Sequence, residues 1–245
     1  MPVSSAELIS FDSPEALADA AAEAWVREVE AANGAGKLLC VALSGGRITQ
    51  KFFLSTVEKA LARKISFARV HFFWADERCV PPDDPESNYK LAEDLLFEPL
   101  TISEGQIHRL KGELPPEEAV KQANTEIADI APSQGGQPIL DLIFLGMGED
   151  GHVASLFQNA RLAPQKDAKC NPFIFVPNSP KPPPKRISLN YEALSAAMQV
   201  WVLASGTGKE DALRKSLSGE GLTPLGQVIK SRKITKVFVD IPLGI

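Results

Sequence analysis

The sequence is poor in residues that cross-link a chain and has no segment that anchors one in a membrane. Its three cysteines, Cys40, Cys79 and Cys170, lie far apart and form no Cys-x-x-Cys pair. This odd number and wide spacing argue against a disulfide framework and a zinc knuckle, and indicate reduced thiols. No apolar run is long enough to span a bilayer, and the start, MPVSSAELISFDSPEAL, lacks the features of a secretory leader. We therefore expect a cytosolic protein.

Long runs of like charge are also missing. The chain has 31 acidic and 26 basic residues, which gives a formal net charge of -5 at pH 7. Without a basic tract, we expect neither nucleic-acid binding nor attachment to a membrane surface. If the ligand is an anion, the fold has to gather positive charge locally.

The chain does contain a regular alternation of strand-like and helix-like segments. Its 245 residues are 44% hydrophobic, which suffices for a sizeable core and predicts a single domain over residues 1–245. Apolar periodicity predicts helices at 14–32, 48–62, 88–97 and 116–131, and strands at 37–43, 69–75, 138–146, 199–205 and 236–242. The alternation predicts an α/β fold with an open, mostly parallel, doubly wound (Rossmann-like) sheet and helices on both faces.

Residues 158–190 depart from this alternation. Within them, NSPKPPPKRISLNY contains a proline run between two lysines, followed by the short strand-like stretch RISLN. A proline run is stiff and extended, and proline is excluded from central strands. We expect an inserted loop or a small subdomain here.

Three unusual polar stretches directly follow predicted strands. They are SGGR at 44–47, DER at 76–78 and GMGEDGH at 146–152. In open α/β sheets, ligands bind outside the carboxyl ends of the strands, where helix N-termini supply partial positive charge. These three stretches are therefore the candidate binding site.

The first stretch, Ser44-Gly45-Gly46-Arg47, has a composition that suits a phosphate. It offers unobstructed backbone amides, a hydroxyl and a guanidinium at the start of a helix. The alternative is that the glycines serve only a tight turn. Because the stretch is neither G-x-G-x-x-G nor a P-loop, a dinucleotide or a nucleoside triphosphate is disfavoured.

The third stretch places Asp150 two residues before His152, at a glycine-rich turn. Glycines allow a sharp turn and a close approach of the backbone to a ligand. His152 then has the ordinary pKa of a general base, Asp150 can orient its imidazole or bind a hydroxyl, and main-chain amides can stabilise an oxyanion. A lone loop histidine can also be structural, which is the role we assign to His71 and His108.

Four segments together carry a resemblance to a known family. SGG, WADERCVPPDDPESNYKLAEDLL, LDLIFLGMGEDGHVASLF and RISLNYEAL occur in this order over about residues 40–195. The combination resembles the 6-phosphogluconolactonase family, which is similar in turn to the glucosamine-6-phosphate isomerases and deaminases. The resemblance implies hydrolysis of 6-phospho-D-glucono-1,5-lactone, a small sugar-phosphate lactone, to 6-phosphogluconate in the pentose phosphate pathway, without a metal or an organic cofactor.

The resemblance also implies roles for particular residues. His152 would activate water and then return a proton to the ring oxygen, while Asp150 and Arg78 would hold substrate hydroxyls and the histidine. The turn Ser44-Gly45-Gly46 would bind phosphate, with Arg186 and Lys209 as basic candidates. Further expected substrate contacts are Arg47, Asp76, Asn88 and Gly148.

Two features leave alternatives open. The family's first motif usually reads SGG-S-T-P, whereas this chain has SGG-R-I-T, so Arg47 either adds a phosphate contact or projects into solvent. Arg186 precedes its own strand, so it reaches the cleft only if that strand runs antiparallel or the proline loop folds back. Oligomeric state and tolerance of other sugar lactones stay open.

The main competing function is that of a sugar-phosphate isomerase or deaminase. The related deaminases carry a glutamate in a pattern like DGH-I-A-F-N-E-P, whereas residues 153–158 here are VASLFQ and contain no carboxylate. A non-catalytic sugar-phosphate sensor is the other alternative. Such sensors are commonly joined to a DNA-binding helix-turn-helix, for which we expect no room in the thirteen residues before the first helix.

Overall fold

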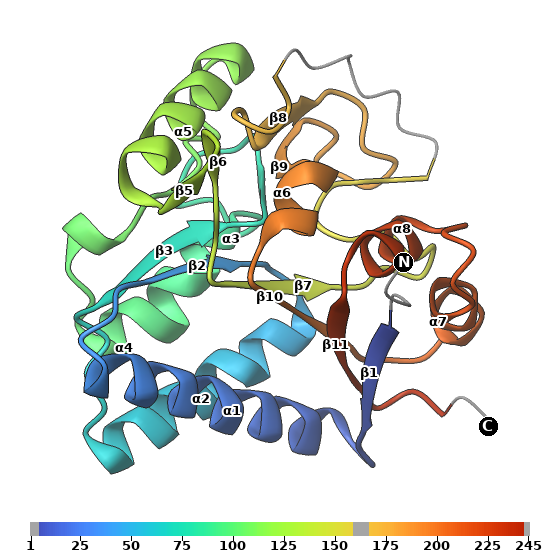
Figure 1. Ribbon diagram of the computed structural model, residues 1–245, viewed down its shortest axis with the longest axis horizontal. Coiled ribbons are helices and arrows are strands. Elements are labelled where there is room, and N and C mark those ends of the chain that lie inside the picture. The colour runs from blue at the N-terminus through green and yellow to red at the C-terminus, as the bar shows by residue number, and fades with distance from the viewer. Residues whose placement is uncertain (1–4, 159–166, 243–245) are drawn as a thin grey trace.

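A single parallel sheet forms the centre of the molecule. The computed structural model describes residues 5–158 and 167–242. Within these residues, six strands pair in parallel in the order β1-β11-β10-β7-β2-β3 (Figure 1). Their bounds are Ser5–Ser10 (β1), Leu39–Leu43 (β2), Val70–Trp74 (β3), Leu142–Gly146 (β7), Gln199–Ala204 (β10) and Ile234–Val239 (β11). The predicted parallel α/β fold is confirmed.

The strand order reverses in the middle of this sheet. From β2 the chain goes to β3 on one side, whereas β7, β10 and β11 follow in turn on the other side. Strands β2 and β7 are direct neighbours, with Val41 opposite Leu142 and Ala42 opposite Ile143. Such a reversal leaves a crevice at the carboxyl ends of the two strands, because the loops that leave them diverge to opposite faces.

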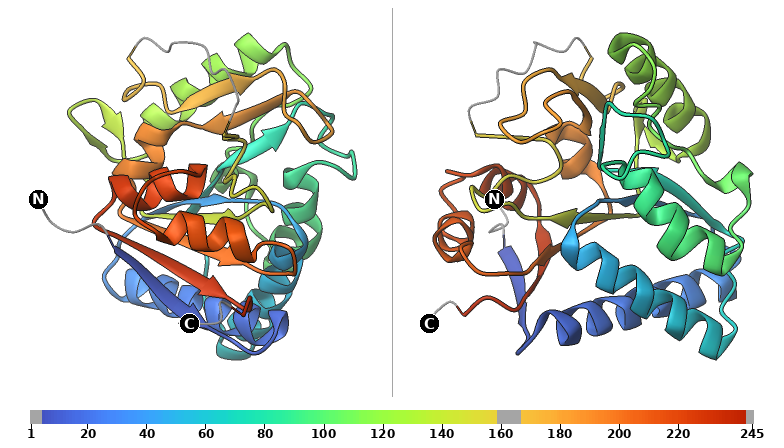
Figure 2. Two further views of the ribbon diagram at one scale, coloured as in Figure 1. Left: turned by 90° about the vertical axis from the view of Figure 1, so that its right-hand side faces the viewer. Right: turned by 180° about the vertical axis from the view of Figure 1, so that it is seen from behind.

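Helices cover both faces of the sheet, as Figures 1 and 2 show. Helices α1 and α2 pack against each other on one face, whereas α5, α6 and α8 lie on the other side. The α-helices are Pro14–Gly34 (α1), Arg47–Arg63 (α2), Asn88–Ala92 (α3), Glu98–Leu100 (α4), Pro116–Ile130 (α5), Tyr191–Ala196 (α6), Glu210–Leu217 (α7) and Pro224–Ser231 (α8). A π-helical turn, Glu93–Phe97, and a 3₁₀ turn, Glu104–Gln106, complete the set among the described residues.

The main core lies between the sheet and the α1–α2 pair. Trp25 of α1 is fully buried, and its ring centroid is 5.4 Å from that of Phe52 in α2 and 5.1 Å from that of Phe144 in β7. Burial of one such side chain stabilises the fold by about 1.5–3 kcal/mol. Helix α1 begins as expected, because the Ser13 side chain accepts a hydrogen bond from the amide of Ala16 and Pro14 occupies the first turn.

A small antiparallel sheet rises above the carboxyl ends of the main strands. Its order is β4-β9-β8, with bounds Asp76–Arg78, Arg186–Leu189 and Phe173–Val176. A short hairpin, Ser133–Gln134 (β5) and Gln137–Pro138 (β6), lies beside α5. The predicted small subdomain is confirmed, although β4 comes from outside residues 158–190. Residues 159–166 of that segment lie outside the described residues.

Several predicted elements need correction. The strand predicted at 138–146 begins at Leu142, because Gln137 and Pro138 belong to the β5–β6 hairpin. The helix predicted at 88–97 is not a continuous α-helix, since a π-helical turn follows α3. Strands β1 and β8 and helices α6, α7 and α8 were not predicted.

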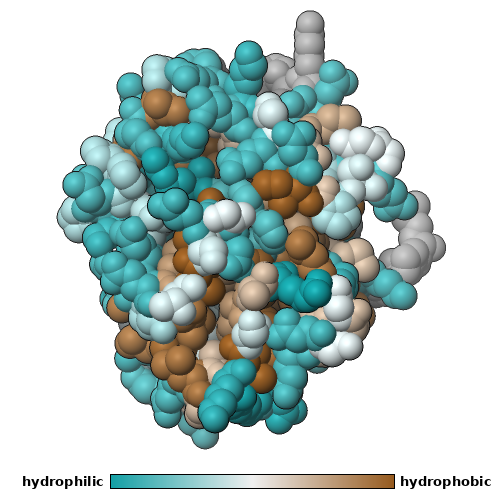
Figure 3. Space-filling model, turned by 90° about the vertical axis from the view of Figure 1, so that its left-hand side faces the viewer, coloured by the Kyte–Doolittle hydropathy of each residue, from teal (hydrophilic) through white to brown (hydrophobic). Residues whose placement is uncertain are grey.

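The side of the molecule at the left of Figure 1 is covered mostly by hydrophilic side chains, with hydrophobic atoms exposed between them in the lower half (Figure 3). Among the described residues, the exposed large hydrophobic side chains are Leu38, Leu54, Leu61, Met198, Leu222 and Ile234. No helix within the described ranges has the length and apolar character needed to cross a bilayer.

Candidate active site

A cleft of about 670 Å³ opens where the strand order reverses. The carboxyl ends of β2, β7 and β10 form its floor, and the loop before β9 forms one wall. Eleven of the twelve predicted site residues line it: Ser44, Gly45, Gly46, Arg47, Asp76, Arg78, Asn88, Gly148, His152, Arg186 and Lys209. The twelfth, Asp150, does not line the cleft but contacts the ring of His152.

The Ser44–Arg47 turn connects β2 to helix α2. Gly46 has a φ of 113°, which favours glycine, and a Cβ on Gly45 would lie only 1.9 Å from the side-chain oxygen of Asn88. The Ser44 hydroxyl donates to the backbone carbonyl of Phe144 at 2.8 Å, and thereby joins β2 to β7. No side chain caps α2, so its N-terminal amides and partial positive charge are available at the cleft.

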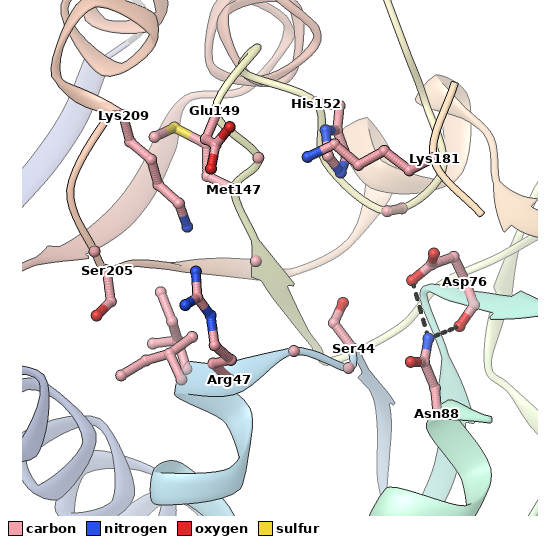
Figure 4. A pocket seen from close by; sticks show the side chains of 18 of the residues that line it. Ser44, Arg47, Asp76, Asn88, Met147, Glu149, His152, Lys181, Ser205 and Lys209 are labelled. Atoms are coloured by element: carbon pink, nitrogen blue, oxygen red, sulfur yellow. Dashed lines mark hydrogen bonds between the residues drawn. The ribbon is translucent and has the colours of Figure 1, made fainter. Parts of the chain in front are cut away.

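Three cations line the cleft into which this helix N-terminus opens. Arg47 begins α2, Lys209 immediately precedes α7, and Lys181 comes from the loop before β9. Figure 4 shows Arg47 and Lys209 pointing toward one another across the cleft. Burial lowers the pKa of Lys209, and the positive charges of Arg47 and Lys181 lower it further. Cations that repel one another in a cleft favour an anionic ligand, because an anion relieves their repulsion.

His152 and Asp150 form a hydrogen-bonded pair at the other end of the cleft. The Nδ1 atom of His152 lies 2.5 Å from Oδ1 of Asp150, which also accepts from the amide of His152 at 3.3 Å. The imidazole packs against Phe157, with ring centroids 4.6 Å apart. A proton on Nδ1 shared with a carboxylate leaves Nε2 as the basic nitrogen.

The environment keeps His152 neutral near pH 7. Burial lowers the pKa of His152 below its ordinary value of 6.5, although the hydrogen bond and charge of Asp150 act in the opposite direction. Burial raises the pKa of Asp150, but the hydrogen bonds and charge from His152 outweigh it, and the pKa lies below its ordinary value. A neutral imidazole with an ionised partner is the state that a general base needs.

Gly148 makes the close packing of this pair possible. A Cβ on Gly148 would lie 2.0 Å from both Cε1 and Nδ1 of His152. The Gly148 amide donates to the His152 carbonyl at 2.9 Å, which closes the turn. A glycine is therefore required here by the proximity of the ring.

Glu77 fixes the loop that delivers Arg78 and Asn88 to the cleft. Its buried carboxylate accepts hydrogen bonds from the amides of Arg78, Asn88 and Tyr89 at 2.7, 2.8 and 2.7 Å. Burial raises the pKa of Glu77 to about 7, against the effect of these amides. Glu77 does not itself line the cleft, so it holds the loop from outside the cleft.

At the base of the cleft, Asp76 accepts hydrogen bonds from both Asn88 and Ser155. The Asn88 amide nitrogen donates to the Asp76 carbonyl at 2.8 Å (Figure 4), and the Ser155 hydroxyl donates to the Asp76 carboxylate at 2.7 Å. All three side chains are buried. The Asp76 carboxylate, the Asn88 amide nitrogen and the Ser155 hydroxyl already have partners, so these residues shape the cleft at least as much as they offer contacts to a ligand.

The two arginines of the small sheet are held by backbone carbonyls. Nη1 of Arg78 donates to the carbonyl of Glu86 at 2.5 Å, whereas its buried Nε has no partner among the described residues. Arg186 lies in a strand that is antiparallel to β4 and β8, which meets the condition for it to reach the cleft. Its guanidinium donates to the carbonyls of Lys181, Pro182 and Pro183. Contact of either arginine with a substrate stays a prediction.

Sequence reasoning missed several residues of the cleft lining. Lys181, Glu149, Ser205 and Thr207 were not predicted as site residues. The stiff proline run beside Lys181 was the available signal, because it holds a neighbouring side chain in a fixed direction. Ser155 had no such signal, since its role depends on the contact with Asp76.

The other two histidines lie outside the cleft lining. Nδ1 of His71 is 2.8 Å from Nε2 of His108, whose Nδ1 is 2.8 Å from Glu126. These contacts link β3 to α5 and agree with structural roles. Within the described ranges, no group of three or more His, Cys, Asp or Glu side chains is arranged to hold a metal ion.

Residues 12–237 match the family model described as "Glucosamine-6-phosphate isomerases/6-phosphogluconolactonase". A protein of Mycobacterium tuberculosis named 6-phosphogluconolactonase is 35% identical over 219 residues, which cover 85% of each chain. The chain belongs to the 6-phosphogluconolactonase family.

Two further relatives of this family member extend the comparison. A rice protein named probable 6-phosphogluconolactonase 3, chloroplastic, is 34% identical over 96% of this chain and 74% of its own length. The crystal structure of a 6-phosphogluconolactonase from Thermotoga maritima superposes with a TM-score of 0.76 at 30% identity, and covers 95% of this chain and 98% of its own. The resemblance in the sequence motifs therefore extends over nearly the whole fold.

Proposed function

We propose that this member of the family is an enzyme that hydrolyses 6-phospho-D-glucono-1,5-lactone to 6-phospho-D-gluconate. The observation that carries the proposal is the arrangement of the cleft, with the His152–Asp150 pair at one end and the Arg47–Lys209 cations at the other. A substrate with a phosphate on one terminal carbon and a lactone carbonyl on the other has complementary chemistry. Its place in the oxidative pentose phosphate pathway follows from that reaction.

In the proposed reaction, Nε2 of His152 takes a proton from a water molecule as the water oxygen bonds to the lactone carbonyl carbon. Asp150 stabilises the resulting imidazolium and keeps the ring in the productive tautomer. The tetrahedral intermediate then collapses, the bond from the carbonyl carbon to the ring oxygen breaks, and His152 donates its proton to that oxygen. The product is an open-chain acid, which ionises at neutral pH.

The phosphate would be bound by charge and by helix geometry together. Arg47 and Lys209 supply positive charge, and the amides at the start of α2 supply hydrogen-bond donors beside Gly45 and Gly46. On this view Arg47, which replaces the usual small hydroxyl residue, adds a phosphate contact. Arg78 and Asn88 are placed to contact substrate hydroxyls.

A sugar-phosphate isomerase or deaminase is the less favoured function. Such chemistry moves a proton from carbon, and the segment after His152 offers no carboxylate for it. Location in the cytosol stays a prediction, because the rice relative carries a chloroplastic designation.

The test is a lactone-opening assay corrected for spontaneous hydrolysis, with glucosamine 6-phosphate assayed in parallel for ammonia release. We expect the wild-type protein to open the lactone and to release no ammonia. The His152→Ala variant should lose roughly 10²- to 10⁴-fold in kcat, the usual contribution of a general base. His71→Ala is the matched control and should keep wild-type kcat, since His71 does not line the cleft. Equal turnover in His152→Ala and the wild type would remove His152 from the reaction.

A further inference from the structure

Lys181 reaches the reactive end of the cleft from an unusual backbone. It begins the run Lys181-Pro182-Pro183-Pro184, which precedes β9. Its side chain lines the cleft, and Figure 4 shows its amino group beside the His152 ring. Burial is the main cause of the lowered pKa of His152, and the positive charge of Lys181 lowers this pKa further, against the effects of Asp150 and Asp76.

The backbone of Lys181 is bound on both sides. The Ser179 hydroxyl donates to the Lys181 carbonyl at 2.9 Å and accepts from the Lys181 amide at 3.1 Å. Nη2 of Arg186 donates to the carbonyls of Lys181 and Pro182 at 3.3 and 3.2 Å, and its Nε donates to Pro183 at 3.1 Å. These contacts fix the Cα of Lys181, so only its side-chain torsions stay free.

Arg186 uses its Nε and Nη2 groups to bind this loop. The side chain is 5% exposed, and its remaining nitrogen lies 3.4 Å from the Ser155 hydroxyl and 3.8 Å from the Asp76 carboxylate. Prolines supply no backbone N–H, so the loop cannot hold its own carbonyls in a regular hydrogen-bond pattern. A buried guanidinium that binds three consecutive carbonyls fixes the course of the loop, and with it the position of Lys181.

Of the three cations, Lys181 is the one whose charge acts on His152, although that charge also reaches Lys209. Arg47 and Lys209 face each other at one end of the cleft, whereas Lys181 lies at the end occupied by His152 (Figure 4). In the proposed substrate, the carbonyl and the phosphate are at opposite ends of a six-carbon chain. When the phosphate lies between Arg47 and Lys209, the lactone carbonyl at the other end of the substrate lies close to Lys181.

We infer that Lys181 is a catalytic residue that stabilises the oxyanion formed from the lactone carbonyl, and that Arg186 is the positioning residue that holds Lys181 there. The inference rests on the lactonase activity proposed above. As water adds, the π electrons of the carbonyl move to its oxygen, and the ammonium of Lys181 stabilises that charge without giving up a proton. The charge returns to the carbonyl when the ring C–O bond breaks, and His152 protonates the departing oxygen.

Kinetics of Lys181→Met test the catalytic half of the inference. Loss of one oxyanion-stabilising group costs about 10²- to 10³-fold in kcat, so we expect a fall of that size with KM changed by less than about threefold. The acidic limb of the kcat/KM profile should move to higher pH, because a neighbouring positive charge that lowers the pKa of His152 has been removed. Lys181→Arg, which keeps the charge, should recover part of the loss.

Lys185→Met is the matched control, because Lys185 lies at the other end of the same proline run and does not line the cleft. It should behave as the wild type. An unchanged kcat in Lys181→Met, or a loss confined to KM, would overturn the catalytic role. A wild-type protein that opens the lactone no faster than the spontaneous reaction would instead overturn the proposed function itself.

The positioning half is tested by non-additivity. If Arg186 acts through Lys181, Arg186→Met should lower kcat and shift the acidic limb as Lys181→Met does, and the double variant should lose no more than the larger single loss. Ser179→Ala provides a milder release of the same loop and serves where Arg186→Met does not fold. Multiplicative losses in the double variant, or a Ser179→Ala protein with unchanged kcat and an unshifted limb, would overturn the positioning role.

Discussion

His152 and Asp150 are only two residues apart, and their side chains meet because a glycine-rich turn folds them together. The 2.5 Å contact between Nδ1 and Oδ1 sets the tautomer of the imidazole. Two opposing influences set its basicity, since Asp150 raises the pKa of His152 whereas burial and Lys181 lower it. Removal of the Asp150 charge and removal of the Lys181 charge should therefore shift the pKa of His152 in opposite directions.

Asp150→Asn should lower kcat by roughly 10²-fold or more, because the amide neither stabilises an imidazolium nor enforces one tautomer. Removal of the carboxylate also lowers the pKa of His152, so the neutral base persists to lower pH. The acidic limb of kcat/KM, which we expect below pH 6.5 in the wild type, should move further down. This is the reverse of the shift predicted for Lys181→Met.

Steady-state profiles between about pH 5 and 9 measure both quantities for Asp150→Asn. Asp129→Asn, an exposed change on α5, is the control and should leave the profile in place. A limb that moves upward in Asp150→Asn would show that another group sets the pKa of the base.

The identity of single residues was the more predictable part of the site. His152, Asp150 and the Ser44–Arg47 turn are marked in the sequence by their neighbours, since glycines beside polar residues at a strand end fit a ligand-binding turn, although a tight turn alone also needs glycine. The position of Arg186 could not be predicted from the sequence, because its partners are three carbonyls of a loop whose course depends on the fold. Lys181 was missed although the proline run beside it was a signal, because the direction of that run depends on the fold.

The turn after β7 is the element that places the base. Gly148→Ala should keep the overall fold but displace the imidazole, because the new Cβ would lie 2.0 Å from two ring atoms of His152. A shift of about 1 Å in a reacting group can cost on the order of 10²-fold in rate, so we expect a loss of that size in kcat. Far-ultraviolet circular dichroism and kcat, measured on the same preparation, check the two parts.

Gly34→Ala at the end of α1 is the comparison, since its Cβ would meet nothing within 4 Å. It should keep wild-type activity. Wild-type kcat in Gly148→Ala would mean that the turn tolerates a side chain and that the position of the ring is not critical.

Elements were predictable where their environment is uniform. Strand β2 is buried at every position, and its continuous apolar run correctly predicted a strand. Strand β1 was missed because it lies at the sheet edge, where residues 6–10 are half-buried or exposed and show no regular alternation. The π-helical turn after α3 was missed because its sequence, EDLLF, is as compatible with an α-helix.

At the scale of the molecule, topology determines where the site lies. The reversal of strand order between β2 and β7 brings together loops that are a hundred residues apart, and this adjacency is not visible in any local pattern. The predicted α/β class was sufficient to place the site at the carboxyl edge, because every parallel strand ends there. A single domain over residues 1–245 stays a prediction.

The chain has a formal net charge of -5, yet its proposed substrate is a phosphate ester, so the cleft has to offset the long-range repulsion. Replacement of Arg47 or Lys209 by Met should raise KM by roughly 10-fold or more, as expected for one lost charge-assisted contact, with a smaller effect on kcat. Added salt should raise the KM of the wild type more steeply than that of either variant.

Lys215→Met, an exposed change on α7, is the control and should alter neither KM nor kcat. Because Arg47 and Lys209 share one anion, their losses should not multiply in the double variant, and unchanged KM in both singles would place the phosphate elsewhere.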